Sequence, residues 1–151
     1  MKTAEAGKYD CIRLENQLCF PLYAGAQEVT RKYREPLKEL DLTYTQYIVM
    51  MVLWEHGDMT EGELGKRVHL DSGTLAPLLK RLEKHGVISR QRLEGNERKL
   101  QISLTEKGEA LKEKAAGVPA KMQGCIDLSE EEAVQLKALL DKALTKMEKA
   151  R

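Results

Sequence analysis

The sequence predicts a mainly α-helical fold that carries one small β-hairpin. Of its 151 residues, 42% are hydrophobic but only 5% are aromatic, a balance that favours helices over a β-sandwich. Apolar residues recur at helical spacing along most of the chain. The pattern changes after Gly86, where residues 87–93 are rich in β-forming types and residues 99–104 alternate between apolar and polar side chains. We therefore expect four helices, then two strands, then two further helices.

The first long helix is expected over residues 14–33. Its apolar side chains recur every three or four positions, at Leu14, Leu18, Leu22, Ala26, Val29 and Tyr33. Pro21 interrupts this pattern, because proline lacks the backbone N–H that an interior helical residue donates. Either the helix kinks there, or its regular part begins near Cys19. The second arrangement would place Cys19 in a first helical turn, where the helix dipole favours a thiolate.

Three further helices are expected before the hairpin. One covers residues 45–56, and the next opens with the capping box Thr60-Glu61-Gly62-Glu63. After a tight turn at residues 69–70, either Asp71 or Ser72 caps a third helix. This third helix turns one face of leucines inward, at Leu75, Leu78, Leu79 and Leu82.

Two helices are expected after the hairpin, whose turn lies at residues 94–97. Thr105 caps the first of them, which is interrupted near residues 117–119. Ser129-Glu130-Glu131-Glu132 is a second capping box and opens the last helix. This last helix carries an apolar stripe at Leu136, Leu139, Leu140, Ala143, Leu144 and Met147.

A capped short helix, a tight turn, an amphipathic helix and a hairpin, in this order, are typical of a winged helix-turn-helix. Its second helix enters the major groove of double-stranded DNA, and its hairpin reaches the neighbouring minor groove. We expect four side chains of that second helix to face an operator, namely Ser72, Thr74, Pro77 and Arg81. Taken singly, each of them could equally well be a helix cap or a solvated side chain.

The charge distribution supports a nucleic-acid partner. The formal net charge is only +1, but residues 80–99 contain seven lysines and arginines against three acids. Four of these cations, Arg90, Arg92, Arg98 and Lys99, belong to the expected hairpin, and Arg90 and Arg98 are expected to contact DNA. A local basic patch of this kind can bind phosphates even in a nearly neutral protein.

The stretch Asn96-Glu97-Arg98, followed by Leu104-Thr105-Glu106-Lys107-Gly108, resembles the wing signature of MarR-family transcription regulators. In that family the pattern is Asp-x-Arg, then five residues, then Leu-Thr-x-x-Gly, so this chain has Asn96 in place of the usual Asp. The resemblance implies that Arg98 is the wing arginine that enters the minor groove. Residues 14–23, 42–47, 53–56 and 70–75 narrow the resemblance to the organic hydroperoxide resistance regulators (OhrR), over nearly the whole chain.

This resemblance implies that Cys19 is the peroxide-reactive cysteine. It further implies that Tyr33 and Tyr44 contact the sulfur, at least partly across a dimer, and that Cys125 is the resolving cysteine of a two-cysteine class, bonded to the opposite subunit. An ordinary thiol is mostly protonated at neutral pH, so fast attack on a peroxide needs donors that stabilise the thiolate. The sulfenic acid formed then condenses with a second thiol. Apolar neighbours of Cys19 favour organic hydroperoxides as the oxidant.

We expect one domain over residues 1–151, because a chain of this length is short for two independent cores. Residues about 45–104 would form the winged helix-turn-helix. Residues about 10–35 and 105–151 would form dimerisation helices of a homodimer, since their apolar stripes lack another evident partner.

The three cysteines, an odd number, do not form the disulfide framework of a secreted protein. We found neither a signal peptide nor an apolar run long enough to span a membrane, so we expect a cytoplasmic protein. No cofactor or metal site is expected, because the three histidines do not pair with any cysteine at ligand-like spacing. Cys11 is either incidental or a partner for Cys19.

The sequence thus predicts a homodimeric repressor that senses organic hydroperoxides through oxidation of Cys19 and then releases DNA. One alternative is a MarR-like regulator that responds to a small phenolic ligand. The other is a thiol peroxidase enzyme. We expect that the protein is not an enzyme, because peroxide reduction does not need a complete winged helix-turn-helix.

Overall fold

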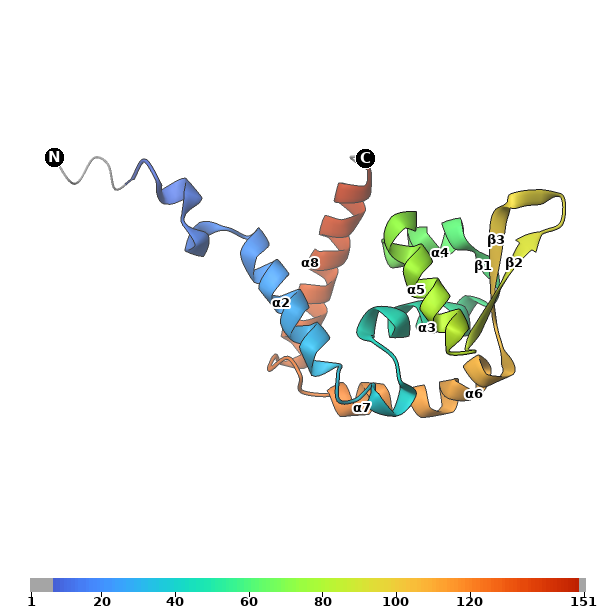
Figure 1. Ribbon diagram of the computed structural model, residues 1–151. Helices are drawn as coiled ribbons and strands as arrows, with labels where there is room; N and C mark the ends of the chain where they lie inside the picture. The colour runs from blue at the N-terminus through green and yellow to red at the C-terminus, as the bar shows by residue number, and fades with distance from the viewer. Residues whose placement is uncertain (1–6, 150–151) are drawn as a thin grey trace. The chain divides into compact units, whose positions relative to one another are not determined.

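The computed structural model describes residues 7–149, and these form two compact units that divide after Lys121 (Figure 1). The main helices of the first unit are α2 (Cys19–Lys32), α3 (Tyr44–His56), α4 (Glu61–Val68), α5 (Ser72–Lys84) and α6 (Glu106–Ala115). Its strands are β1 (Met59–Thr60), β2 (Ile88–Leu93) and β3 (Asn96–Leu104). The short helix α7 (Val118–Met122) spans the division, and α8 (Glu130–Lys149) belongs to the second unit. The mainly α fold with a hairpin wing is confirmed.

The expected single domain over residues 1–151, with dimerisation helices at both ends, stays a prediction. Residues 1–6 and 150–151 of that range lie outside the described residues. Within the described residues, no helix combines the length and the apolar character needed to span a membrane.

The helix α2 begins at Cys19, which confirms the second of the two expected arrangements around Pro21. Pro21 is the third residue of the helix, where a backbone N–H has no intrahelical acceptor, so its missing donor costs nothing. The preceding residues form two short 3-10 helices, Asp10–Ile12 and Leu14–Asn16, instead of an extension of α2. No residue of α2 is buried.

The helix α3 supplies much of the core of the first unit. Its start is fixed by a capping box in which the Gln46 backbone N–H donates to Thr43 Oγ1 (3.3 Å) and the Thr43 N–H donates to Gln46 Oε1 (2.9 Å). The buried residues are Gln46, Tyr47, Val49, Met50 and Leu53. The apolar pattern of residues 45–56 predicts that Ile48, Val49, Val52 and Leu53 face inward. Val49 and Leu53 are buried, whereas Ile48 and Val52 are only half-buried, because α3 is apolar on nearly every side.

The helices α4 and α5 form the helix-turn-helix. The capping box at Thr60 and Glu63 is confirmed. Asp71, not Ser72, caps α5, because Asp71 Oδ1 accepts the Thr74 backbone N–H at 2.8 Å. Leu75, Leu79 and Leu82 of α5 are buried, whereas Leu78 is only half-buried.

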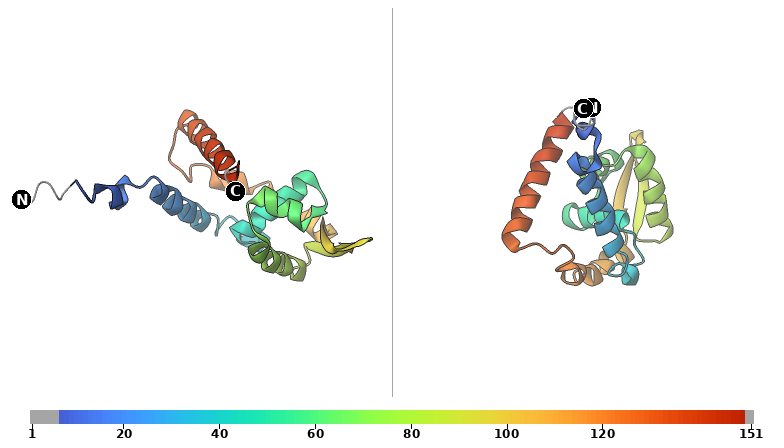
Figure 2. Two further views of the ribbon diagram at one scale, coloured as in Figure 1. Left: turned by 90° about the horizontal axis from the view of Figure 1, so that it is seen from above. Right: turned by 90° about the vertical axis from the view of Figure 1, so that its left-hand side faces the viewer.

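The strands β2 and β3 form an antiparallel hairpin, and the short β1 pairs with the other edge of β3. The turn is tighter than expected, because Leu93 already pairs with Asn96 and only Glu94 and Gly95 connect them. Gly95 has a φ of 81°, a conformation that favours glycine. Beyond its base the hairpin extends away from the helices (Figure 2). The strand β1 was not predicted, because two residues are too few to show an alternation of apolar and polar side chains.

A close joint connects α6 to the hairpin and to α3. Thr105 caps α6 and its hydroxyl also donates to the Gly86 carbonyl at 2.6 Å. A Cβ atom at Gly108 would lie only 1.9 Å from the Val87 carbonyl oxygen, so only glycine fits there. The Trp54 indole N–H donates to the Gly108 carbonyl at 2.9 Å. This joint explains physically why the pattern Leu-Thr-x-x-Gly follows the wing.

The helix α8 begins with the expected capping box, in which the Glu132 N–H donates to Ser129 Oγ at 3.2 Å. None of its residues is buried. Its exposed large apolar side chains are Val134, Leu136, Leu139, Leu144 and Met147.

We predict that Gly108→Ala destabilises the protein by roughly 1–3 kcal/mol or more, because the new methyl group must displace the Val87 backbone. Gly62→Ala is the matched control, since a Cβ at that exposed helical position meets nothing within 4 Å. It should be neutral or stabilising by up to about 1 kcal/mol. Urea denaturation measures both free energies of unfolding, and equal stabilities of the two variants would contradict the tight joint.

Candidate functional site

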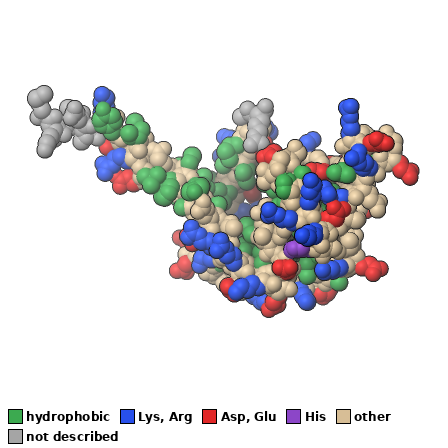
Figure 3. Space-filling model, in the orientation of Figure 1, with side chains coloured by type: hydrophobic (Ala, Val, Ile, Leu, Met, Phe, Trp, Pro, Cys, Tyr) green, Lys and Arg blue, Asp and Glu red, His purple; other side chains and the backbone are tan. Residues whose placement is uncertain are grey.

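Cys19 is the first residue of α2 and is exposed to solvent. Its apolar neighbours are exposed as well, with Leu18 78% and Phe20 42% accessible. Figure 3 shows apolar side chains gathered along this part of the chain. A single chain therefore does not enclose the thiol in the apolar pocket that the sequence suggested.

Tyr33 and Tyr44 lie together at the junction between α2 and α3. Their rings stack with centroids 4.1 Å apart and an interplanar angle of 19°. Tyr47 continues the row, with its ring centroid 6.0 Å from Tyr33 and 6.3 Å from Trp54. Burial raises the pKa of the Tyr47 phenol, and the nearby Tyr44 raises it further. The structure thus brings together two of the predicted site residues at one end of an aromatic row.

The same structure keeps Cys19 away from these tyrosines. Tyr33 is the C-cap of the helix that Cys19 begins. At 1.5 Å per residue, the fourteen steps along that helix separate their backbones by about 21 Å. This distance is far beyond hydrogen-bond range, so one chain cannot place the phenol of its own Tyr33 on its own Cys19 thiol.

The other two thiols are also free. Cys125 belongs to the second unit, where it is half-buried in the turn before α8 and its N–H donates to the Met122 carbonyl at 3.0 Å. Cys11 is exposed in the first 3-10 helix. Its carbonyl accepts the Gln17 side-chain N–H at 2.7 Å.

The predicted recognition residues share the exposed surface of α5. Ser72, Thr74, Pro77 and Arg81 are all exposed. The Thr74 side chain already makes one hydrogen bond within the protein, because its hydroxyl donates to Asp71 Oδ2 at 3.2 Å. The hydrogen bonds from Thr74, its backbone N–H first, hold the pKa of the Asp71 carboxyl below its usual value.

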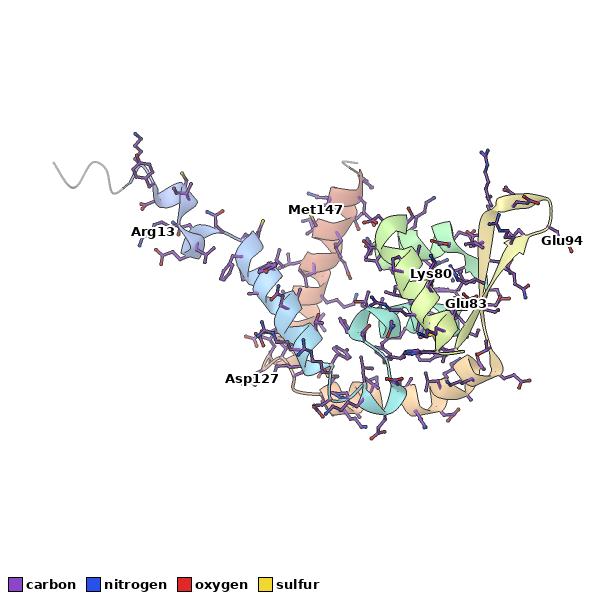
Figure 4. The ribbon with its side chains drawn as sticks, in the orientation of Figure 1. Arg13, Lys80, Glu83, Glu94, Asp127 and Met147 are labelled. Carbon is purple, nitrogen blue, oxygen red and sulfur yellow. The ribbon has the colours of Figure 1, made fainter. Side chains whose placement is uncertain are left out.

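Two further exposed cations of α5, Lys80 and Lys84, were not predicted as DNA-binding residues. Figure 4 labels Lys80 on this helix. Lys80 follows Pro77, and Lys84 follows Arg81, at helical spacing. The period of the helix could therefore have identified both lysines from the sequence.

The tip of the hairpin presents Arg98. Its backbone N–H donates to Asn96 Oδ1 at 3.3 Å, so the amide that replaces the family's aspartate still accepts a hydrogen bond. Arg92 braces the opposite strand by donating to the Glu97 carbonyl at 3.0 Å. Within residues 7–149, the Arg98 guanidinium makes no ion pair.

Arg90 differs from the other predicted DNA-binding residues. Its Nε and Nη2 atoms lie 3.0 and 2.9 Å from Glu83 Oε2. Its side chain is only 17% exposed. A direct contact between Arg90 and DNA therefore stays a prediction.

A groove of about 480 Å³ was not foreseen, because its lining comes from helices far apart in the sequence. The lining residues are Tyr47, Met51, Trp54, Glu55, Lys112, Ala115, Ala116 and Pro119. Among the described side chains, no group of three or more histidines, cysteines and acids could hold a metal ion.

Residues 31–115 match the family described as transcriptional regulator SarA/Rot. The organic hydroperoxide resistance transcriptional regulator of Bacillus subtilis (strain 168) is 48% identical over 133 residues, which cover 88% of this chain and 90% of that protein. This similarity extends over nearly the whole chain.

Two solved structures of AbfR are also similar to this chain over nearly its whole length. Reduced AbfR bound to DNA is 34% identical, with a TM-score of 0.74 over 93% of this chain and 98% of that one. The disulfide form of AbfR is 32% identical, with a TM-score of 0.59 over 95% and 96% of the two chains. AbfR comes from Staphylococcus epidermidis. The chain therefore belongs to the MarR-family transcription regulators, in the branch of the organic hydroperoxide resistance regulators.

Proposed function

We propose that the protein is a homodimeric DNA-binding repressor that senses organic hydroperoxides through Cys19 and releases its operator when oxidised. The observation that carries this proposal is an exposed thiol at the first residue of α2, about 21 Å along the helix from the stacked tyrosines. Each chain holds the two halves of a thiol site at opposite ends of one helix. A second copy can complete both.

The exposed apolar side chains of the described residues support association with a second copy. On α2 and the segment before it they are Tyr9, Ile12, Leu14, Leu18, Phe20, Leu22 and Tyr23. A large apolar surface of this kind marks an interface. In a two-fold dimer with antiparallel α2 helices, Cys19 of one chain would lie beside Tyr33 and Tyr44 of the other. The same apolar side chains would then surround each thiol.

The chemistry at such a site balances without a cofactor. The Cys19 thiolate attacks one oxygen of the hydroperoxide, an S–O bond forms, the O–O bond breaks, and the second oxygen leaves as the alcohol after taking a proton. In such a dimer the tyrosine phenols of one chain could donate hydrogen bonds to the Cys19 sulfur of the other. The Cys125 thiol would then attack the sulfenic sulfur, which forms a disulfide and releases water. A reducing cytoplasm would keep all three cysteines as reduced thiols.

The DNA-binding part of the proposal places α5 in the major groove and the hairpin in the minor groove. Ser72, Thr74, Pro77 and Arg81 would face the bases and phosphates, and Arg98 would enter the minor groove. A structure of the similar AbfR bound to DNA supports DNA binding by this chain.

A continuous row of contacts could connect the thiol site to the DNA-binding part. Tyr33 and Tyr44 lie at one end of the aromatic row and Trp54 at the other. Trp54 donates to Gly108, next to the base of the hairpin. We propose that oxidation of Cys19 shifts the dimer between two arrangements of these elements, only one of which fits the operator.

The groove on α3 and α6 favours a second candidate, a regulator that binds a small phenolic ligand. Tyr47, Met51 and Trp54 offer an apolar lining, and Lys112 offers a cation for a phenolate. Release of DNA by such a ligand would not depend on Cys19. A peroxidase enzyme is disfavoured, because the similar proteins are regulators.

We predict that Cys19→Ser binds DNA with parental affinity but no longer releases it when cumene hydroperoxide is added. Fluorescence anisotropy with a 30-base-pair duplex, selected by the parent protein from a random pool, measures both properties. Cys11→Ser is the matched control and should respond as the parent does. Persistent release from Cys19→Ser would contradict the sensor role.

We predict that Cys125→Ala still oxidises at Cys19 but forms no crosslinked dimer, because the sulfenic acid lacks its resolving thiol. Non-reducing electrophoresis detects the dimer, and intact mass detects the added oxygen. A reducible dimer in the Cys125→Ala variant would assign the resolving role to another cysteine.

We predict that Arg98→Ala weakens operator binding by about 1–3 kcal/mol, because the wing loses its groove contact. Lys99→Ala is the control, since adjacent strand residues point to opposite faces. Titration of the same duplex gives both affinities. Equal affinities for Arg98→Ala and the parent would mean that the wing is not engaged.

A further inference from the structure

We propose that Arg90 is a positioning residue for DNA binding, and that its ion pair with Glu83 fixes the wing relative to α5. This inference rests on the proposed DNA binding, and it gives Arg90 a role different from direct contact with DNA. Two elements that enter neighbouring grooves must keep one mutual geometry, because the groove spacing of the duplex is fixed. The salt bridge between Glu83 of α5 and Arg90 of β2 can do this.

The Glu83–Arg90 pair connects the last turn of α5 to the third residue of β2. Both Nε and Nη2 of Arg90 contact Glu83 Oε2, at 3.0 and 2.9 Å. Both charge-assisted contacts end on one carboxylate oxygen, and together they hold one edge of the Arg90 guanidinium against Glu83. Among the described residues, this is the salt bridge that joins α5 to the hairpin.

The location of Glu83 supports a pairing role. A carboxylate in the last turn of a helix lies at the negative end of the helix dipole, which disfavours it. It also lies on a basic helix that is proposed to approach phosphates. The helix dipole and the nearby phosphates both disfavour a carboxylate at Glu83 unless it binds a cation. Arg90 is that cation.

The neighbouring cations differ from Arg90. Lys80, Arg81, Lys84 and Arg98 are exposed and make no side-chain ion pair within the described part of the chain. Arg90 has its guanidinium engaged and its side chain 83% covered, since 17% is exposed. A phosphate contact by Arg90 would first have to break the pair with Glu83.

The position of Arg90 makes the brace effective. Arg90 lies opposite Ile102, whose side chain is fully buried, at the base of the hairpin. Beyond it the strand continues for about 13 Å to the tip at Glu94, so a tilt of about 10° would move the tip by about 2 Å. This displacement is a large fraction of a minor groove about 6 Å wide. Figure 4 shows Glu83 near the base of the hairpin and Glu94 at its tip.

The test uses Glu83→Gln in the full-length protein, with the selected 30-base-pair duplex as the probe. Removal of an acid near phosphates should by itself tighten binding. The brace predicts the opposite, a roughly 3- to 30-fold weaker affinity. Backbone amides of residues 93–99 should also exchange hydrogen faster than in the parent, while the thermal midpoint stays close to the parental value.

Three further variants separate a brace from a direct contact. Arg90→Lys keeps the charge but not the two-atom contact, so it should weaken binding without changing its salt dependence. Loss of a direct phosphate contact in Arg90→Ala would lower the salt slope by about 1, as expected for Arg81→Ala. The exchanged pair Glu83→Arg with Arg90→Glu should recover most of the affinity that either single change removes.

The inference is overturned if Glu83→Gln binds as tightly as the parent or more tightly. It is overturned as well if Arg90→Ala lowers the salt slope by about 1, because Arg90 would then contact phosphate directly. In both cases the parent still binds DNA and the proposed function stands. A parent protein that selects no duplex would remove the proposed function and this inference together.

Discussion

The separation of Cys19 from Tyr33 along one rigid helix is the constraint on which the account depends. The helix α2 has 14 residues, begins at the thiol and ends beside the stacked tyrosines. A helix cannot fold back on itself, so the thiol and Tyr33 of one chain stay at opposite ends of α2. We propose that dimerisation brings the thiol of one chain to the tyrosines of the other. Thiol reactivity would then require the assembly that also sets the spacing of the two DNA-binding parts.

The DNA-binding part is held by contacts that leave little freedom between its elements. Gly108 lets α6 approach the Val87 backbone, and Trp54 joins α3 to the same point. The proposed Glu83–Arg90 brace would add the remaining connection, between α5 and the hairpin. We propose that a part fixed at these points would move as a rigid body, so that a change at the thiol site would alter the spacing of the two DNA-binding parts of a dimer. A small displacement at the thiol site would suffice to release DNA, because α5 and the hairpin must fit neighbouring grooves at the same time.

Much of the fold was predictable from the sequence, because patterns among neighbouring residues determine where many of its helices and strands begin. Capping boxes at Thr60 and Ser129 and the change of period after Gly86 need only neighbouring residues. The two-residue β1 and the complete buried face of α3 were not predictable, since both are decided by distant partners. For the site, local motifs and family resemblance selected Cys19, Tyr33, Tyr44 and the exposed face of α5. They could not show that Arg90 pairs with Glu83, seven residues away on another element.

The most direct test of a site shared between chains is the oxidation rate of Cys19 in a mixed dimer. One chain carries Cys19→Ser, and the other carries Tyr33→Phe with Tyr44→Phe. If the site is shared, the mixed dimer keeps one complete site, and its single Cys19 reacts with cumene hydroperoxide at the parental rate. If the mixed dimer reacts as slowly as the homodimer of the Tyr33→Phe, Tyr44→Phe chain, the thiol and the tyrosines do not meet across the interface, and the account is wrong.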